Sequence, residues 1–288
     1  MIKGEDFELL CGIVKSRSGL TLSPDKAYLL ENRLMAVARK WGMNDIDGLA
    51  AAVRGGPNEE LLREITEAMT TNETLFFRDQ TPFEQLEKVV LPRLLESRKE
   101  SRHIRIWSAA CSSGQEPYSI AMILKGMGSI LDNWRIDIHA TDISRTMLDK
   151  ARAGLYTQFE VQRGLPIAML MKYFRQAGDK WEIDPGIRSM VDFAEFNLLS
   201  DPTKKGQFDI VFCRNILIYL DPPTKTRVLD NVWKLMPADG ILYMGGAETV
   251  MGVTEKFQPV SEHRGMYSCV RGAGSGQGHA PANYASNA

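Results

Sequence analysis

Apolar residues recur three and four positions apart through the first 70 residues of the chain. The positions that carry this pattern are Phe7, Leu10, Ile13, Val14, Leu61, Leu62, Ile65 and Met69. Residues at this spacing lie on one face of a helix, so each run predicts a helix that buries that face. We therefore expect residues 1–70 to form an all-helical domain.

From residue 84 onward, continuous apolar runs alternate with amphipathic ones. The sequence predicts an amphipathic helix over 84–100, a short buried strand from Ile104 and a helix that begins near Pro117. Further buried strands are expected at 136–143 and 208–213. Strands that alternate with helices predict a mostly parallel, doubly wound α/β sheet with right-handed crossovers.

Other segments do not follow this alternation. Residues 165–173 are expected to be helical. The additional extended segments are predicted at 180–183, 189–196, 257–260 and 265–270. The last two of these would form an antiparallel hairpin at the edge of the sheet. Residues 272–288 are rich in Gly, Ser, Ala and Asn without any periodicity, so we expect a disordered tail.

The composition is that of an ordinary globular protein, with 44% apolar and 25% charged residues. The formal net charge of −1 argues against nucleic-acid binding, which usually requires a strongly basic balance. The four cysteines are scattered without metal-ligand spacing, so we expect neither a metal site nor a disulfide framework. The chain has no signal-peptide core and no run of about 18 apolar residues, and we expect a cytoplasmic protein without membrane insertion.

The stretch from Ile104 to Met122 contains the first candidate for chemistry. A buried strand leads through small residues, among them Gly114, onto the start of a helix, and such a turn can hold a nucleotide-like ligand. The same pattern also occurs as a plain structural turn, and both interpretations stay open at this point. Asp142 ends the next strand, where a carboxylate usually accepts hydrogen bonds from ribose hydroxyls. Because Glu116 would repel a phosphate, a sulfonium nucleoside fits better than NAD or ATP.

Several motifs in order along the chain carry a family resemblance. They are Thr71-Asn72-Glu73-Thr74-Leu75-Phe76-Phe77-Arg78-Asp79, the segment 107–118, Ala140-Thr141-Asp142-Ile143-Ser144, Phe196-Asn197-Leu198 and the segment 208–219. Over about residues 5–270 the chain resembles chemotaxis-receptor protein-glutamate O-methyltransferases, the CheR family. Independent motifs in the right succession are far more specific than any one of them.

The resemblance implies a class I methyltransferase, a Rossmann-like α/β fold with a doubly wound, mostly parallel sheet of seven strands. It also implies that the helical domain over 1–70 faces the receptor and that a linker at 71–83 contributes to the cofactor site. The methyltransferase domain would then occupy 84–271, with a small antiparallel β-subdomain inserted at about 154–196.

The resemblance further implies an activity. In this family S-adenosylmethionine donates a methyl group to glutamate carboxylates in the cytoplasmic helical region of chemoreceptors, and S-adenosylhomocysteine is the product. We therefore expect protein-glutamate O-methyltransferase activity in sensory adaptation. A glutamate carboxylate is already ionised near neutral pH and needs no general base, which agrees with the lack of an obvious His/Asp pair in the sequence.

Individual residues receive roles from the same resemblance. Those expected to bind the cofactor are Asn72, Thr74, Arg78, Glu116, Asp142, Asn197, Leu198, Arg214 and Asn215. Arg78 and Tyr219 occupy positions that orient the acceptor carboxylate, so both are candidate catalytic residues. Structural alternatives exist, since Asp142 could cap the helix after Ser144 and Tyr219 could be a buried aromatic residue.

A basic stripe is predicted on the second helix of the helical domain. Lys26, Arg33 and Lys40 are seven positions apart and so lie on one helix face. This face could be merely solvated, or it could dock an acidic helical partner. In the family, basic residues of this helix face the receptor, and the chain keeps Arg33 and Arg39 of that pattern. Together with the stripe, this makes Lys26, Arg33, Arg39 and Lys40 the candidate docking residues.

Some relatives also bind a receptor pentapeptide through the β-subdomain. The turn at 176–180 is shorter and poorer in glycine than in those relatives, so we expect that this tether is not required. We further expect the chain to act as a monomer.

Two other functions remain open on the sequence alone. One is a class I methyltransferase that acts on a small molecule or on another protein, although the basic helix and the inserted segment argue against it. The other is a non-catalytic module that senses the cofactor, although a decayed enzyme would be expected to lose some of Arg78, Asp142 and Tyr219.

Overall fold

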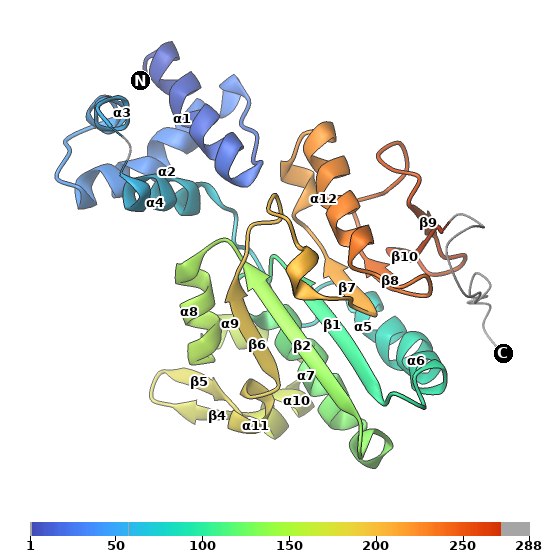
Figure 1. Ribbon diagram of the computed structural model, residues 1–288. Helices are drawn as coiled ribbons and strands as arrows, with labels where there is room; N and C mark the ends of the chain where they lie inside the picture. Colours follow the sequence, from blue (N-terminus) through green and yellow to red (C-terminus); the bar gives the residue numbers. More distant parts are fainter. Residues whose placement is uncertain (1, 57, 272–288) are drawn as a thin grey trace. The chain divides into compact units, whose positions relative to one another are not determined.

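The computed structural model describes residues 2–56 and 58–271, and the predicted disordered tail lies outside these residues (Figure 1). The chain divides into two compact units. One comprises the residues up to Thr71 together with Tyr219–Lys225, and the other comprises Asn72–Ile218 and the residues from Thr226 onward. The first is called the helical unit and the second the sheet unit.

The helical unit confirms the prediction of helices over the first 70 residues. Its elements are α1 (Gly4–Ser18), a 3-10 turn (Pro24–Lys26), α2 (Ala27–Lys40), α3 (Ile46–Arg54) and α4 (Glu59–Met69). The core between them is made by apolar residues from each α-helix, and Leu10, Leu30, Leu34, Leu49 and Ile65 are fully buried. Leu10 and Ile65 belong to the two predicted apolar runs, so the predicted faces of α1 and α4 pack into this core.

A second segment of the chain, 219–225, completes the helical unit. Leu20 and Leu220 form an isolated antiparallel bridge, and the N–H of Thr21 donates to the carbonyl of Tyr219 at 3.0 Å. The ammonium group of Lys15 also pairs with Asp221 at 2.7 Å. The helical unit is therefore discontinuous in sequence, which the helical periodicity could not indicate.

The sheet unit is built on the predicted seven-stranded, mostly parallel sheet. Its strands in spatial order are β6 (Val191–Glu195), β2 (Arg135–Asp142), β1 (His103–Ala109), β7 (Ile210–Cys213), β8 (Ile241–Tyr243), β10 (Met266–Cys269) and β9 (Phe257–Pro259). The first five run parallel, and β10 is antiparallel to both of its neighbours. The predicted edge hairpin is thus confirmed as β9 and β10.

Helices flank this sheet, and α7 runs behind strands β1 and β2 in Figure 1. The helices that alternate with these strands are α5 (Thr81–Gln85), α6 (Leu91–Ser97), α7 (Gln115–Gly126), α8 (Arg145–Ala153) and α12 (Pro222–Lys234). Short 3-10 turns occupy Gly128–Leu131, Thr203–Lys205 and Leu217–Tyr219. Helix α7 begins two residues before the predicted Pro117, because Gly114 caps it in a left-handed conformation with φ of 93°.

The helix predicted over 84–100 is interrupted by a π-helical turn at Leu86–Val90. Pro92 lies in the first turn of the following helix, α6. Because proline has no N–H, it cannot donate to the carbonyl four residues earlier. The turn just before it has the i→i+5 hydrogen bonds of a π-helix in place of the i→i+4 bonds of an α-helix. The proline was visible in the sequence, but its effect on the preceding turn was not predicted.

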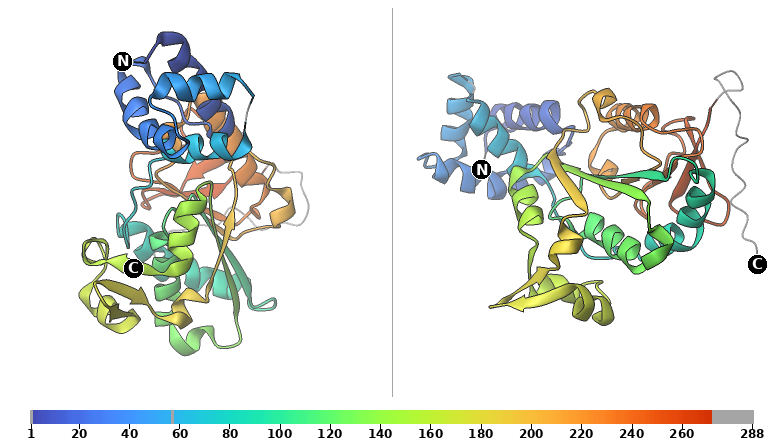
Figure 2. Two further views of the ribbon diagram at one scale, coloured as in Figure 1. Left: turned by 90° about the vertical axis from the view of Figure 1, so that its left-hand side faces the viewer. Right: turned by 60° about the horizontal axis from the view of Figure 1, so that its bottom comes forward.

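The inserted β-subdomain lies apart from the main sheet, in yellow at the lower left of Figure 1 and at the bottom of the right-hand view in Figure 2. It contains a separate antiparallel sheet with the order β3, β5, β4. The elements are β3 (Leu155–Thr157), α9 (Gln158–Gln162), α10 (Ile167–Tyr173), β4 (Phe174–Ala177), β5 (Lys180–Ile183) and α11 (Pro185–Arg188). Strand β6 pairs with β2 in the main sheet, so the inserted sheet ends before the predicted residue 196.

The predicted linker packs against this subdomain. Phe76 is fully buried, and its ring meets the rings of Tyr156 and Phe174 edge-on at 5.0 and 5.5 Å between centroids. Gly164 has φ of 80° and approaches the Phe76 carbonyl so closely that an added Cβ would lie 2.0 Å from the oxygen. The segment from Asn72 is thereby held by the subdomain, and only glycine fits at position 164.

Within the described part of the chain, no helix has the length and apolar character that crossing a bilayer requires.

Candidate active site

Parallel strands bring loops from distant parts of the sequence to one edge of the sheet. The carboxyl ends of β1, β2, β6, β7 and β8 share this edge because all five strands run in the same direction. Strand β1 lies between β2 and β7, and the chain order moves outward from it to either side. In open α/β sheets this switch point is where ligands bind.

Unusual backbone conformations concentrate near this edge. Of the nine described non-glycine residues with positive φ, six lie in the linker and in the loops after β1 and β7. They are Phe77, Asp79, Gln80, Ala110, Ser112 and Asn215. Residues with side chains are rarely found in this region of φ/ψ space, and such strain is characteristic of functional sites.

Asp142 is buried at the end of β2, as predicted, and holds two loops together. Its carboxylate accepts hydrogen bonds from the backbone N–H of Ser112 at 2.8 Å and of Ser144 at 2.9 Å. The N-cap of α8 is Ser144, whose hydroxyl accepts from the N–H of Met147 at 3.3 Å. The suggested capping role for Asp142 is therefore filled by its neighbour, and Asp142 organises the strand ends instead.

The linker is bound to the same edge of the sheet. The carbonyl of Asn72 accepts a hydrogen bond from the hydroxyl of Ser112 at 2.9 Å, and the N–H of Phe77 donates to the hydroxyl of Ser119 at 3.0 Å. The guanidinium of Arg78 donates to the carbonyl of Glu73 at 2.9 Å. Asn72, Thr74 and Arg78 are half-buried there. Two predicted groups that are 70 residues apart, Asn72 and Asp142, thus share Ser112 as a common partner.

An ion cluster around the buried Arg214 joins the linker to the loops after β1 and β7. Arg214, with a side chain only 1% exposed, donates to Glu116 at 2.9 Å and to Asp79 at 2.8 Å. It also donates to the carbonyl of Arg78 at 2.7 Å. Glu116 accepts a further hydrogen bond from the hydroxyl of Ser108 at 2.8 Å. The structure therefore brings the side chains of Glu116 and Arg214 and the backbone of Arg78 together, and Arg214 balances the charge of Glu116.

The remaining cofactor candidates follow the edge strand β6 and the central strand β7. Asn197 follows β6, and its side-chain oxygen accepts from the N–H of Leu199 at 2.9 Å. The carbonyl of Leu198 accepts from Asn231 at 3.3 Å. The N–H of Phe196 donates to the carbonyl of Asp142 at 2.9 Å, which ties this loop to the end of β2. Asn215 lies directly after Arg214, with φ of 59°.

The residues predicted for the acceptor side belong to the helical unit. Tyr219 is half-buried there, and its carbonyl accepts from Thr21. Arg33 donates to the carbonyls of Met69 and Thr70 at 2.8 and 2.9 Å and thus caps the end of α4.

Of the other residues in the predicted basic stripe, Arg39 and Lys40 lie on α2, whereas Lys26 ends the 3-10 turn before it rather than lying on the helix. Lys40 pairs with Glu64 at 2.8 Å, while Lys26 and Arg39 are exposed. Two of the four predicted docking residues therefore have partners inside their own unit.

Two buried thiols flank the site, and both stay protonated. Burial, reinforced by the carboxylates of Asp142 and Glu116, raises the pKa of Cys111 well above its usual value. Burial also raises the pKa of Cys213, reinforced by the carboxylates of Glu248 and Glu116. Since the thiolate is the reactive form, neither cysteine is suited to act as a nucleophile.

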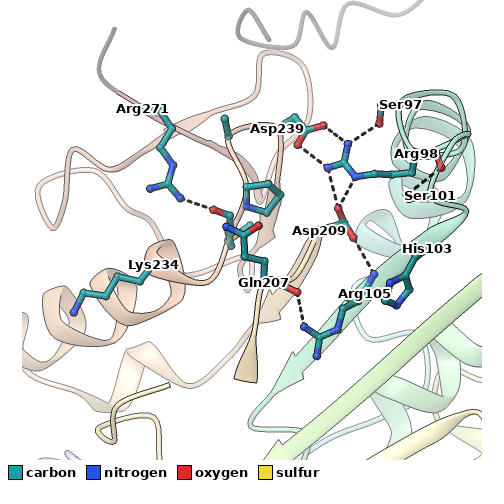
Figure 3. Close-up of a pocket in the computed structure, with 13 residues that line it drawn as sticks. Ser97, Arg98, Ser101, His103, Arg105, Gln207, Asp209, Lys234, Asp239 and Arg271 are labelled. Atoms are coloured by element: carbon teal, nitrogen blue, oxygen red, sulfur yellow. Dashed lines mark hydrogen bonds and ion pairs between the residues drawn. The ribbon is translucent and has the colours of Figure 1, made fainter. Parts of the chain in front are cut away.

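A hollow of about 680 Å³ lies at the opposite edge of the sheet from this site, near the amino ends of β1, β7 and β8 (Figure 3). Two of its cationic side chains, Arg98 and Arg105, are bonded within the fold. Arg98 pairs with Asp209 at 2.9 Å and with Asp239 at 2.7 Å, and Arg105 donates to the carbonyls of Lys205 and Gln207. We assign structural roles to these cations, because the fold itself supplies their partners.

Sequence reasoning missed several groups that hold the site together. Ser112 links Asn72 to Asp142, Ser108 bonds to Glu116, and Asp79 is the second carboxylate of the Arg214 cluster. All three lie inside the quoted motifs, but small polar residues carry no signal of their own there. Their roles depend on which loops become neighbours, and this is fixed only by the order of the strands.

The residues at the carboxyl edge fit S-adenosylmethionine. Asp142 offers a buried carboxylate for ribose hydroxyls, and Glu116 offers one for an amino group. The buried Nε–H of Arg214 has no hydrogen-bond partner among the described residues, and an acceptor group on a bound ligand would satisfy it. The fold and this set of groups define a class I methyltransferase.

The chain belongs to the CheR methyltransferase family. The family description "CheR methyltransferase, SAM binding domain" matches residues 72–266, and "CheR methyltransferase, all-alpha domain" matches residues 5–70. The protein is thus an S-adenosylmethionine-dependent methyltransferase, and the predicted enzyme class, cofactor and family are confirmed.

Named relatives agree with this assignment. The chain is 38% identical over 261 residues to the chemotaxis protein methyltransferase Cher2 of Pseudomonas putida, covering 88% of this chain and 94% of that protein. It is 39% identical over 265 residues to chemotaxis protein methyltransferase 1 of Pseudomonas aeruginosa, with the same two coverages. Chemotaxis protein methyltransferase 1 of Vibrio cholerae is 37% identical over 270 residues, covering 92% of this chain and 96% of that protein.

Proposed function

We propose that this enzyme methylates glutamate side chains in the cytoplasmic helical region of chemoreceptors during sensory adaptation. The observation that carries the proposal is that the linker is bonded to the carboxyl edge of the sheet. Asn72 bonds to Ser112, and both the Arg78 carbonyl and the Asp79 carboxylate bond to Arg214. Residues at the family's cofactor positions, which are far apart in the sequence, thereby become neighbours. Asp142 joins them through Ser112, and Glu116 joins them through Arg214.

S-adenosylmethionine, when bound, supplies a methyl group on a positively charged sulfur that leaves as a neutral thioether. The protein then needs to align the acceptor and exclude water rather than to remove a proton. In the proposal Asp142 holds the ribose hydroxyls, Asn197 and Leu198 face the adenine, and Glu116, Arg214 and Asn215 hold the methionine portion. Asn72 and Thr74 would complete the cover over the cofactor, and Arg78 with Tyr219 would orient the acceptor carboxylate.

Receptor docking is proposed for the basic residues of α2 and of the 3-10 turn that precedes it. Lys26 and Arg39 are exposed and suit an acidic helical partner, whereas Arg33 and Lys40 already bond to Thr70 and Glu64. Lys26 and Arg39 are therefore expected to contribute more to receptor affinity than the other two.

We also propose that the enzyme is a cytoplasmic monomer and that it does not require a receptor pentapeptide tether. The hairpin between β4 and β5 turns through only two residues, Gly178 and Asp179, which supports a subdomain with a short turn.

The test of this proposal is transfer of a labelled methyl group from S-adenosylmethionine to a receptor cytoplasmic fragment. The matched control is the same fragment with its candidate glutamates replaced by glutamine. Base-labile label on the first fragment and none on the second is expected, because methyl esters hydrolyse in base and amides offer no carboxylate. No label on any receptor fragment, despite measured cofactor binding, would favour a small-molecule acceptor or a non-catalytic sensor.

Asp142→Ala is expected to weaken binding of S-adenosylhomocysteine by about 1–3 kcal/mol, or roughly 5- to 150-fold. The change removes charge-assisted hydrogen bonds to the ribose and also frees the loop at Ser112. Titration calorimetry measures the effect, and Asp149→Ala serves as a control because that side chain is 75% exposed on α8. Equal affinity in both variants would remove the ribose assignment.

Tyr219→Phe removes one hydroxyl and is expected to lower kcat about 10- to 100-fold, with little change in cofactor affinity. The reason is that the hydroxyl is proposed to orient the acceptor, which is not present when the cofactor binds alone. Steady-state kinetics with a receptor fragment, together with calorimetry, separate the two effects. A variant with normal kcat and normal receptor affinity would remove Tyr219 from the site.

A further inference from the structure

Glu248 is a buried carboxylate in the loop that follows β8, with 9% of the residue exposed. Its oxygen Oε2 accepts hydrogen bonds from the N–H of Asn215 at 2.7 Å and of Gly245 at 2.8 Å. Its other oxygen accepts from the N–H of Leu217 at 2.7 Å and of Ile218 at 3.3 Å. An ionised carboxylate only accepts hydrogen bonds, so four N–H donors match its chemistry.

Three of these donors belong to the segment immediately after β7. Asn215 has a left-handed backbone, and the 3-10 turn Leu217–Tyr219 begins two residues later. The first N–H groups of a helical turn have no partner within the turn, and a negative charge is favourable at that end. Glu248 supplies the missing acceptors for Leu217 and Ile218 and stabilises the strained Asn215.

The contact between the ends of β7 and β8 leaves no space. A Cβ added at Gly245 would lie 2.5 Å from the side-chain nitrogen of Asn215 and 2.8 Å from Oε2 of Glu248. The side chain of Asn215 therefore rests directly on the Gly245 backbone. Two contacts thus fix the position of Asn215: Glu248 accepts a hydrogen bond from its backbone N–H, and Gly245 packs against its side chain.

We propose that Glu248 is a positioning residue of the methyltransferase site. By binding the backbone of 215–218, it fixes the side chain of Asn215 toward the cofactor and the path of the chain that leads to Tyr219. The inference rests on the role proposed above for Asn215 in binding the cofactor. Displacing a positioned group by about 1 Å can cost on the order of 100-fold in rate, so an acceptor of backbone bonds can control the site without touching a substrate.

The experiment compares Glu248→Gln with Glu255→Gln in the full-length chain. Glutamine keeps the shape of Glu248 but places an NH₂ donor against N–H donors, whereas Glu255 is exposed in the same region of the chain. The measurements are the Kd for S-adenosylhomocysteine by calorimetry and hydrogen exchange of the amides at 215–218. We expect Glu248→Gln to raise the Kd about 10- to 100-fold and to speed exchange at Leu217 and Ile218. The control variant is expected to match the wild type.

Two further variants keep the test decisive if Glu248→Gln does not fold. Glu248→Asp retains the charge and is expected to give an intermediate Kd. Gly245→Ala crowds both the Asn215 side chain and Oε2 of Glu248 without changing any charge, and it is also expected to raise the Kd. A purely structural role would lower the melting temperature but leave the Kd of the folded variants unchanged, and that result would overturn the inference. Because the Kd requires no acceptor protein, the outcome is independent of whether receptors are the substrate.

Discussion

Replacement of Arg214 by methionine is expected to lower the free energy of unfolding by about 3–5 kcal/mol, because it leaves the Glu116 carboxylate, whose side chain is only 13% exposed, without its cation. Among the residues that the structure describes, Glu116 would keep only the hydroxyl of Ser108 as a hydrogen-bond partner, and Asp79 and the Arg78 carbonyl would lose their link to the loop after β7. The linker would then be free of one of its anchors, and binding of S-adenosylhomocysteine is expected to fall below detection. Urea denaturation and calorimetry measure the two effects.

A second substitution tests the cause. Glu116→Gln combined with Arg214→Met removes both charges, and part of the lost stability is expected to return, since a neutral pair costs less to bury than a lone carboxylate. No recovery in the double variant would show that packing, rather than charge, carries the effect.

The control for this experiment is Arg98→Met at the opposite edge of the sheet. Arg98 also pairs with two carboxylates, Asp209 and Asp239, and its side chain is 21% exposed (Figure 3). The substitution is expected to destabilise the fold while leaving the affinity for S-adenosylhomocysteine unchanged. If both arginine variants weakened the binding of S-adenosylhomocysteine equally, the ion cluster around Arg214 would have no specific role in the site.

Gly164→Ala is the other change with a large expected effect, at least about 3 kcal/mol of stability. The new Cβ would lie 2.0 Å from the Phe76 carbonyl oxygen, so the backbone of the linker or of the subdomain has to move. The left-handed φ of 80° adds about 1–2 kcal/mol of strain for any residue with a Cβ. Because Phe76 lies between Asn72 and Arg78, affinity for S-adenosylhomocysteine is also expected to fall.

The chain contains a matched control for this substitution. Gly178 has φ of 64°, and an added Cβ there would meet nothing within 4 Å. Gly178→Ala therefore isolates the conformational strain and is expected to cost about 1–2 kcal/mol without any change in cofactor binding. A Gly164→Ala variant as stable as Gly178→Ala would show that the linker backbone can move away from the new Cβ without lowering the free energy of unfolding.

Much of this architecture could be predicted because its signals are local. Apolar spacing located the helices up to residue 70, and the buried runs at 104–109 and 208–213 located strands of the sheet. Asp142 was found because it ends a strand, and strand ends in an α/β sheet share one edge. The π-helical turn before Pro92 and the pairing of β6 with β2 depend on backbone bonding, which apolar spacing does not record.

Contacts between distant loops were the part that could not be predicted. The sequence places Arg214 and Asp79 135 residues apart and gives no indication that they form an ion pair. Likewise, Arg33 has the spacing of an exposed docking residue, yet it bonds to the carbonyls at the end of α4. Periodicity tells which face of a helix a residue occupies, but not which neighbour that face meets.

The discontinuity of the helical unit limits how receptor preference could be exchanged between relatives. A chimaera that replaced only residues 1–71 would separate Leu20, Thr21 and Lys15 from their native partners in 219–225. A graft that preserves these contacts must also carry the segment Tyr219–Lys225. Such a graft necessarily transplants Tyr219 as well, so with the roles proposed above, recognition of a new receptor and alignment of its glutamate would be inherited together.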